Sequence, residues 1–217
     1  MNLIYICDKL KYMETVFDRI KRKKRRRLAE SNFEINSKCD ADPETTSENR
    51  LVDDQNGARG KAFVYGKYPA RHNACEAIAV HNAKVLLGIP STLSETIASF
   101  QLRRAMIFGG FFGSNVLKIG RILKHYGIPY KRFFRKKRLK DKGLFIISFW
   151  NDKPLKNGLH TVALESGKKE YKTYNLYGDG SVSGADPAKY AKRFIVGYYL
   201  GEAPGANKGD NCEKESI

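Results

Sequence analysis

Three residues of the types that catalyse covalent acyl transfer occur along the chain: Cys75, His160 and Asn175. Cys75 comes at the start of a helical pattern, where the positive end of the helix dipole and unpaired main-chain N–H groups lower the pKa of a thiol and favour the nucleophilic thiolate. His160 lies in an otherwise apolar strand pattern, where a buried imidazole needs a polar partner. The alternative for each residue is a side chain that only fills the core.

Asn175, on the following strand pattern, is the partner that we expect for His160. If a four-residue turn at 166–169 joins the two strands, residues whose numbers add up to 335 face each other, and His160 is opposite Asn175. An amide opposite an imidazole fixes the tautomer that leaves the second ring nitrogen able to take a proton from a thiol. The sequence therefore predicts a Cys-His-Asn site in which a thiolate attacks a carbonyl group.

The segments that would position these residues fall into a helical part followed by a strand part. Helices are predicted at 75–87, at 92–106 after a Thr92/Glu95 capping box, and from about 114 to 127. Strands are predicted at 144–150, 159–165, 170–177 and 193–200, with a short helix after Asp186. Helices followed by strands indicate an α+β fold, with three N-terminal helices packed on a C-terminal antiparallel sheet.

The charge of the chain divides it into four segments. The 217 residues carry a formal net charge of +17. Residues 1–27 predict a basic amphipathic helix, 28–60 an acidic flexible linker and 201–217 a disordered tail. The charges of these three segments, +7, −5 and −2, cancel, so the whole excess belongs to residues 61–200, which we predict to be the folded domain that carries the site.

Composition excludes several classes of protein. No run reaches the roughly 18 apolar residues that a membrane-spanning helix requires. The four cysteines are too few and too scattered for a disulfide scaffold or a zinc site. We therefore expect a cytoplasmic protein without a transmembrane segment that needs no metal and no cofactor.

Two basic segments indicate partners rather than chemistry. A basic amphipathic helix such as 1–27 packs on its own domain, pairs with another copy, or binds an anionic membrane surface or nucleic acid. The run at 131–138 interleaves aromatic and basic residues, which suits nucleic-acid binding but is also typical of a solvated strand edge. The excess positive charge favours an acidic peptide as substrate.

The order of the site residues resembles that of the papain-like cysteine peptidases, in which a helix-start Cys is followed by a His at the head of a strand and an Asn on the next strand. The segment from Gly113 to Gly127 is similar to a helix that precedes the sheet in the compact bacterial branch of this family. That branch includes the peptidases that trim double-glycine leader peptides. The resemblance spans roughly residues 65–200 and implies a peptidase or acyl-transfer activity, with the three residues named above as its catalytic residues.

The chain departs from the family pattern near the cysteine. Family members usually have a Gln a few residues before the Cys, and residues 67–73 contain none. Asn73 is the substitute that we expect, because an amide donor beside the N–H of Cys75 supplies the hydrogen bonds that an oxyanion requires. Glu76 replaces the usual Gly, and its carboxylate would raise the pKa of the neighbouring thiol. His81, further along the same helix, is expected at the surface.

The sequence thus predicts a thiol peptidase or acyl-transfer enzyme that acts on a peptide or amide substrate. The alternative is a non-catalytic basic adaptor on a degenerate papain-like fold, which would use residues 1–27 and 131–142 to bind nucleic acid or an anionic membrane surface. The two hypotheses differ in whether Cys75 is required and in whether binding weakens with salt.

Overall fold

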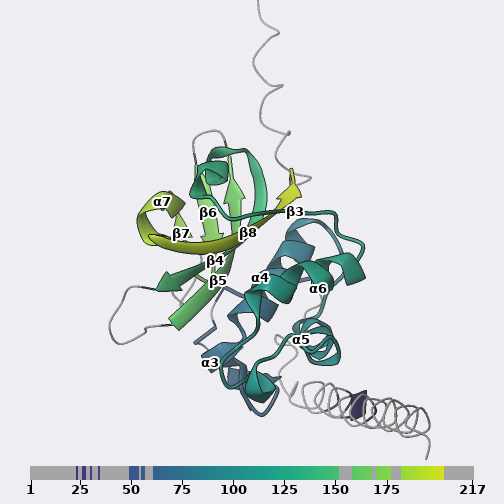
Figure 1. The fold of residues 1–217 in the computed structure, drawn as a ribbon. Helices are drawn as coiled ribbons and strands as arrows, with labels where there is room; N and C mark the ends of the chain where they lie inside the picture. The colour runs from purple at the N-terminus through teal and green to yellow at the C-terminus, as the bar shows by residue number, and fades with distance from the viewer. Residues whose placement is uncertain are drawn as a thin grey trace, which may run out of the picture.

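Helices precede an antiparallel sheet along the chain. The computed structural model describes residues 23, 26, 27, 30, 34, 49–53, 55–56, 61–151, 158–167, 170–176 and 182–202. The helices are α3 (Ala70–Asn73), α4 (Cys75–Leu86), α5 (Leu93–Leu102), α6 (Ile119–His125) and α7 (Pro187–Tyr190), with the 3-10 turns η1 (Phe108–Gly110), η2 (Val116–Lys118) and η3 (Lys136–Lys140). The strands are β1 (Val64–Tyr65), β2 (Tyr68–Pro69), β3 (Lys131–Phe133), β4 (Gly143–Asn151), β5 (Gly158–Ser166), β6 (Tyr171–Tyr174), β7 (Val182–Ser183) and β8 (Arg193–Gly201). This arrangement confirms the predicted α+β class (Figure 1).

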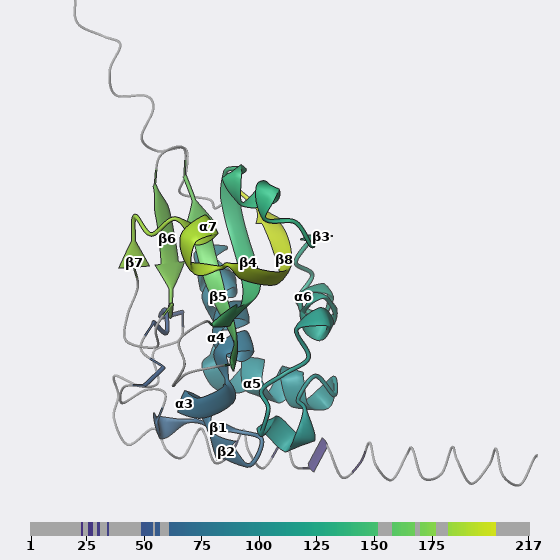
Figure 2. The same ribbon diagram turned by 60° about the vertical axis from the view of Figure 1, so that its left-hand side comes forward.

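The main sheet has six strands in the order β3-β8-β4-β5-β6-β7, and every neighbouring pair is antiparallel. β1 and β2 form a separate hairpin. α4 packs against β5 and β4. Figure 2 shows α3, α5 and the β1–β2 hairpin at one end of the molecule and the main sheet towards the other end.

The start and end of α5 follow from local backbone chemistry. Thr92 Oγ1 accepts a hydrogen bond from Glu95 N at 3.1 Å and caps the helix, as the sequence predicts. The helix ends at Leu102, before the predicted end, and Arg104 follows with a positive φ of 56°. A residue in this left-handed region cannot continue a right-handed helix, so the chain turns away towards η1.

The sheet is buried on both faces. Alternate residues of β4 point to opposite sides, so Ile146 joins the core under the helices while Ile147 joins a second core. That second core includes Leu139 of η3 and is packed by Tyr190 of α7. Burial on both faces explains why residues 144–149 form a nearly continuous apolar run instead of an alternating one.

Arg50, Val52 and Gln55 contact the helices, which corrects the prediction of a flexible linker for that part of 28–60. Val52 is buried. Its main-chain N–H donates to Asn82 Oδ1 at 2.8 Å, and its carbonyl oxygen accepts from Asn82 Nδ2 at 2.7 Å. One buried amide thus satisfies two main-chain groups, which fixes a polar segment that has no long apolar run of its own.

His81 is buried and not at the surface, so that prediction is wrong. Its Nδ1 lies 2.9 Å from Ser91 Oγ and its Nε2 lies 2.9 Å from the carbonyl oxygen of Arg50. The reason is that residues 75–84 of α4 are all buried. A helix covered on every side offers no solvent face, so the angular position of a residue on it does not predict exposure.

Most of the two chain ends lies outside the part of the chain that the structure describes. The basic helix predicted at 1–27 and the tail predicted at 201–217 fall there, apart from residues 23, 26, 27, 201 and 202. Both therefore stay predictions. Within the described residues, no helix is both long enough and apolar enough to span a membrane.

Replacing Asn82 should destabilise the chain. We expect Asn82→Ala to lower the free energy of unfolding by about 2–4 kcal/mol, because it leaves two buried main-chain groups of Val52 without partners. Urea denaturation measures this change. Asn115→Ala is the matched control: it removes an exposed 3.0 Å bond to Leu117 N and should cost about 1 kcal/mol or less. Equal effects of the two substitutions would contradict the role assigned to Asn82.

Candidate active site

The N-terminal end of α4 places Cys75 against β5. Cys75 is the first residue of this helix and is buried. Its Sγ lies 3.9 Å from the carbonyl oxygen of Leu159 and accepts a hydrogen bond from the main-chain N–H of Thr161. The sulfur therefore contacts the main chain on both sides of His160.

Burial decides the protonation state of this thiol. Desolvation raises the pKa of Cys75 well above its ordinary value, and the charge of Glu76 raises it further. The hydrogen bond from Thr161 lowers the pKa by less. Burial therefore acts against the lowering of the thiol pKa that we expect from the start of a helix. The expected effect of Glu76 is confirmed in direction.

Glu76 is a buried carboxyl group beside the thiol. It is 1% exposed, shares a side-chain hydrogen bond with Cys75 and accepts one from the main-chain N–H of Ser114. Its Oε2 has no hydrogen-bond partner among the residues that the structure describes. Burial raises the pKa of Glu76 to about 7. The charge next to the sulfur therefore changes near neutral pH.

Tyr65 and Gly113 enclose this carboxyl group. The phenol of Tyr65 is fully buried and hydrogen bonded to Ser114 Oγ. Burial, and then the charge of Glu76, raise the pKa of Tyr65 well above its ordinary value. Gly113 has a φ of +68°, and a Cβ there would lie 3.2 Å from both carboxyl oxygens. Tyr65, Cys75, Glu76 and Ser114 together form what we call the buried polar cluster.

His160 and Asn175 lie together, through the main chain of Asn175 and not through its amide. Nε2 of His160 is 2.8 Å from the main-chain oxygen of Asn175. The imidazole also packs edge to face on Phe149, with 5.9 Å between ring centroids. A carbonyl oxygen only accepts, so Nε2 carries the proton in this contact. In this tautomer of neutral His160, Nδ1 carries the acceptor lone pair. Nδ1 is then the ring nitrogen that can take a proton from a thiol.

The hairpin that joins β5 and β6 has a different register from the predicted one. Ala163 pairs with Tyr174, so the residue numbers of facing pairs add up to 337, whereas the sequence predicts 335. The turn closes one residue later than expected, with Gly167 N donating to Glu170 O at 2.8 Å. Asn175 therefore lies beyond the end of β6 and has a φ of +61°. This conformation explains why its main chain, and not its side chain, contacts the imidazole.

Gln55 holds Asn175 from a distant part of the sequence. Asn175 Nδ2 donates to Gln55 Oε1 at 2.8 Å, and Gln55 N donates to Asn175 Oδ1 at 3.3 Å. Gln55 Nε2 donates in turn to the carbonyl oxygen of Arg71 at 2.9 Å. This glutamine thus ties the chain after β6 to α3. Sequence reasoning missed it because it falls in the expected linker, where the short apolar pair Leu51-Val52 gives no periodic pattern.

Asn73, which we predicted to bind an oxyanion, makes a different contact in this structure. Its Nδ2 donates to the carbonyl oxygen of Phe111 at 2.5 Å. Asn73 is the last residue of α3 and comes two residues before Cys75, so its amide lies close to the start of α4. Its role towards an oxyanion stays a prediction.

The basic run at 131–138 begins at the edge of the sheet. β3 pairs only with β8 among the described strands, and Lys131 and Arg132 are exposed. The interpretation as a solvated strand edge therefore holds for Lys131 and Arg132, whereas residues 136–138 belong to η3. In the part of the chain that the structure describes, no group of three or more His, Cys, Asp or Glu residues is placed to hold a metal ion.

Two solved structures are similar to this chain. The peptidase domain of Streptococcus ComA, a bi-functional ABC transporter involved in a quorum-sensing pathway, superposes with a TM-score of 0.45 and 12% identity over 60% of this chain and 92% of that chain. A double-glycine-motif protease from an AMS/PCAT transporter, in complex with the leader peptide, gives a TM-score of 0.38 and 19% identity over 60% of this chain and 85% of that chain. No protein family and no curated protein sequence matches the chain. Both solved structures are peptidases, the class that the sequence resembles, but at TM-scores below 0.5 the function must be argued from the residues themselves.

The stability of the chain should depend on pH through Glu76. Its pKa is raised from 4.5 to about 7 on folding, so between these values the folded state holds a proton that the unfolded state releases. The stability that the protonated carboxyl group contributes is therefore fully present below about pH 4.5 and is lost as the pH rises through 7. We expect the wild-type chain to lose up to about 3 kcal/mol relative to Glu76→Gln across this window.

Thermal unfolding at a series of pH values measures this difference. The exposed Glu170 offers a matched control, and Glu170→Gln should keep the pH dependence of the wild-type chain. Parallel pH profiles for Glu76→Gln and the wild-type chain would show that the buried carboxyl group does not titrate in this range.

Removing the charge of Glu76 should also make Cys75 more reactive. Glu76→Gln lowers the pKa of the thiol, because that charge is the second largest cause of its elevation. We expect iodoacetamide to alkylate Cys75 about three to ten times faster near pH 8. Peptide mass spectrometry separates this cysteine from Cys7, Cys39 and Cys212. An unchanged rate would contradict the electrostatic coupling of the two side chains.

Proposed function

We propose that the chain is a thiol peptidase or acyl-transfer enzyme with a papain-like Cys-His-Asn site. The observation that carries the proposal is the placement of Cys75, whose Sγ contacts the main chain of Leu159 and Thr161, one residue to either side of His160. The contact of His160 Nε2 with Asn175 supports the same assignment. The three residues supply the nucleophile, base and orienting group that acyl transfer requires.

In the proposed reaction, Nδ1 of His160 takes the proton of the Cys75 thiol, and the thiolate attacks the carbonyl carbon of an amide. A C–S bond forms, and the carbonyl electron pair moves to oxygen, where the first N–H groups of α4 and the amide of Asn73 stabilise it. The C–N bond then breaks, and the amine leaves with the proton that His160 returns. Water or another amine attacks the thioester, releases the acyl group and restores the thiol.

The raised pKa of Cys75 defines the task of His160. At neutral pH the thiol of the resting chain is protonated, because burial and the charge of Glu76 disfavour the thiolate. In the proposed reaction the thiolate therefore forms only together with an imidazolium, as an ion pair, and not as an isolated anion. An imidazole within reach is thus a requirement of the proposed chemistry.

A peptide or amide is the substrate class that we propose, and the charge favours an acidic one. Residues 61–200 carry the whole excess of positive charge in the sequence. Lys67 and Arg71, which flank the start of α3, are exposed, whereas the carboxyl group of Glu76 is buried. Exposed cations beside a buried carboxyl group attract an acidic peptide to this end of α4.

The decisive measurement is the alkylation of Cys75 with and without His160. The reaction uses limiting iodoacetamide between about pH 5.5 and 7.5, where a thiol of raised pKa without a partner stays protonated and unreactive. If Cys75 forms a thiolate–imidazolium ion pair with His160, it is alkylated in this range. We expect His160→Gln to slow this reaction at least about tenfold, without changing the modification of Cys7, Cys39 and Cys212. Equal rates for wild-type and His160→Gln chains would overturn the proposal.

Asn175→Gly tests whether the orienting contact is made by the main chain. Glycine adopts a φ of +61° readily and keeps the carbonyl oxygen that contacts His160. We therefore expect Asn175→Gly to slow the alkylation of Cys75 only about threefold, through the lost bonds to Gln55. A loss as large as that of His160→Gln would assign the orienting role to the amide side chain.

A further inference from the structure

A loop between α5 and η2 projects three phenylalanines from the molecule. The two ends of the loop form an antiparallel bridge, and Ile107 N donates to Gly113 O at 3.0 Å. Nearer the tip, Lys67 N donates to Gly109 O at 3.2 Å. These bonds fix the loop at its base and at its tip. We call residues 107–113 the aromatic loop.

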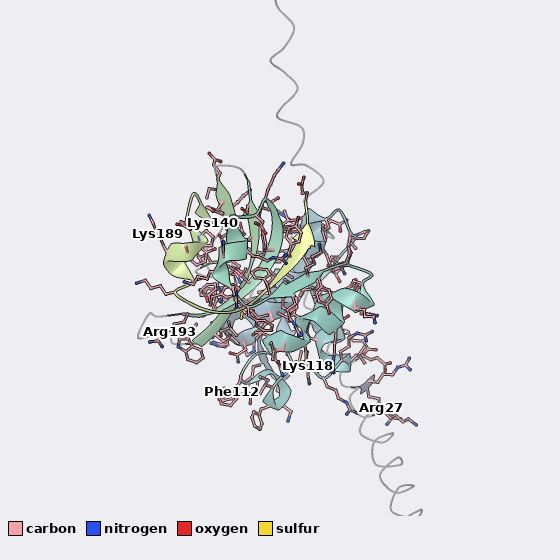
Figure 3. The ribbon with its side chains drawn as sticks, turned by 45° about the horizontal axis from the view of Figure 1, so that its top comes forward. Arg27, Phe112, Lys118, Lys140, Lys189 and Arg193 are labelled. Atoms are coloured by element: carbon pink, nitrogen blue, oxygen red, sulfur yellow. The ribbon has the colours of Figure 1, made fainter. Side chains whose placement is uncertain are left out.

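The aromatic loop exposes most of its apolar surface. Phe108 is 80% exposed, Phe112 64% and Phe111 50%. Ring centroids are 5.8 Å apart for Phe108 and Phe112 and 4.7 Å apart for Phe111 and Phe112. Figure 3 shows Phe112 at the end of the molecule opposite Lys140 and Lys189. A contiguous cluster of exposed phenylalanines marks an interaction surface.

The backbone of the aromatic loop is strained in a way that displays these rings. Phe108 has a φ of +45°, a region that bulky side chains rarely adopt, and Gly109 and Gly110 follow with +67° and +98°. The β1–β2 turn holds this conformation closely, since a Cβ on Gly66 would overlap the carbonyl oxygen of Gly109. Strain of this kind persists only where surrounding contacts hold it, and it clusters at functional sites.

Basic residues lie behind the aromatic loop. Arg103 and Arg104 are exposed at the end of α5, and Lys118 Nζ donates to the carbonyl oxygen of Arg104 at 2.7 Å. Figure 3 places Lys118 at the same end of the molecule as Phe112. Residues 96–140 contain no Asp or Glu. The charge of this stretch is therefore positive throughout, without carboxylates to offset it.

We propose that the aromatic loop binds the surface of an anionic lipid bilayer. Phenylalanine rings on a protruding tip enter the boundary between headgroups and acyl chains, and Lys and Arg side chains behind them contact lipid phosphates. A bound peptide would instead need a groove or a strand edge that supplies main-chain hydrogen bonds. A convex tip with exposed rings and a basic base fits a bilayer surface in both shape and charge.

The aromatic loop is connected to the candidate active site. Phe111 packs on Tyr68 with 5.2 Å between ring centroids, and its carbonyl oxygen accepts the amide of Asn73. Docking of the loop would therefore bring the start of α4, with Cys75, close to lipid headgroups. The proposal does not depend on the proposed activity, because membrane binding is measured equally well on a chain that lacks Cys75.

A tryptophan at the tip of the loop reports insertion directly. Trp150 is the sole tryptophan, so the full chain is prepared with Trp150→Phe and Phe112→Trp. With vesicles of phosphatidylcholine and about one third phosphatidylglycerol, we expect a blue shift of the emission and quenching by brominated acyl chains. Vesicles of phosphatidylcholine alone should give a much smaller effect, because they offer no net negative surface to the cations.

Phe134 provides the matched control. It is 58% exposed and its ring lies 5.5 Å from the guanidinium of Arg132, so it presents similar side chains at the edge of the sheet. In the Trp150→Phe background, Phe134→Trp should show no quenching by brominated lipid. With Trp150 retained, the double substitution Phe108→Ser and Phe112→Ser should weaken vesicle binding at least about fivefold.

Two results would overturn the proposal. Binding of the chain to anionic vesicles without quenching of the Phe112→Trp variant would assign the membrane contact to another segment, such as the basic residues 21–27. A blue shift that grows with protein concentration in the absence of vesicles would assign the aromatic loop to contact with a second copy of the chain.

Discussion

The contact between the first turn of α4 and β5 is the constraint on which the rest of the structure depends. It fixes the sulfur of Cys75 between two main-chain groups of one strand. A strand cannot slip by one residue without turning all of its side chains to the other face. Because the sheet carries a separate core on each face, packing on both sides holds this register. The position of the thiol relative to His160 is therefore determined by the core as much as by the site itself.

The same contact explains the electrostatics of the buried polar cluster. Packing of α4 removes water from Cys75 and Glu76 together, and the pKa of each side chain rises. Two neutral groups tolerate this burial, whereas two anions in contact would not. The fold is thus most stable with the thiol of Cys75 protonated. A thiolate at this position needs a cation beside it, and His160 is the titratable side chain that the chain brings to the same point of β5.

Local features of the structure are predictable from the sequence, whereas long-range ones are not. The caps at Thr92 and Asp186 are readable because each links residues two or three positions apart. The strands β4, β5 and β8 agree with prediction within one residue at each end, because uninterrupted apolar runs mark buried strands. Gln55 and Asn175 are 120 residues apart, and no local pattern records such a pair. The register of the β5–β6 hairpin depends on the residue at which the turn closes, and the composition of the turn alone does not determine that residue.

The attachment of Val52 and Gln55 to the helices affects the choice of boundaries when residues 61–200 are prepared as a separate fragment. A recombinant fragment that begins at Lys61, where charge and composition place the boundary, would lack both residues. The amide of Asn82 would lose its main-chain partners, and Asn175 would lose the glutamine that holds it. Such a fragment would lack contacts that hold Asn175 in place while keeping Cys75 and His160. A lack of activity in that fragment would therefore not test whether Cys75 is catalytic.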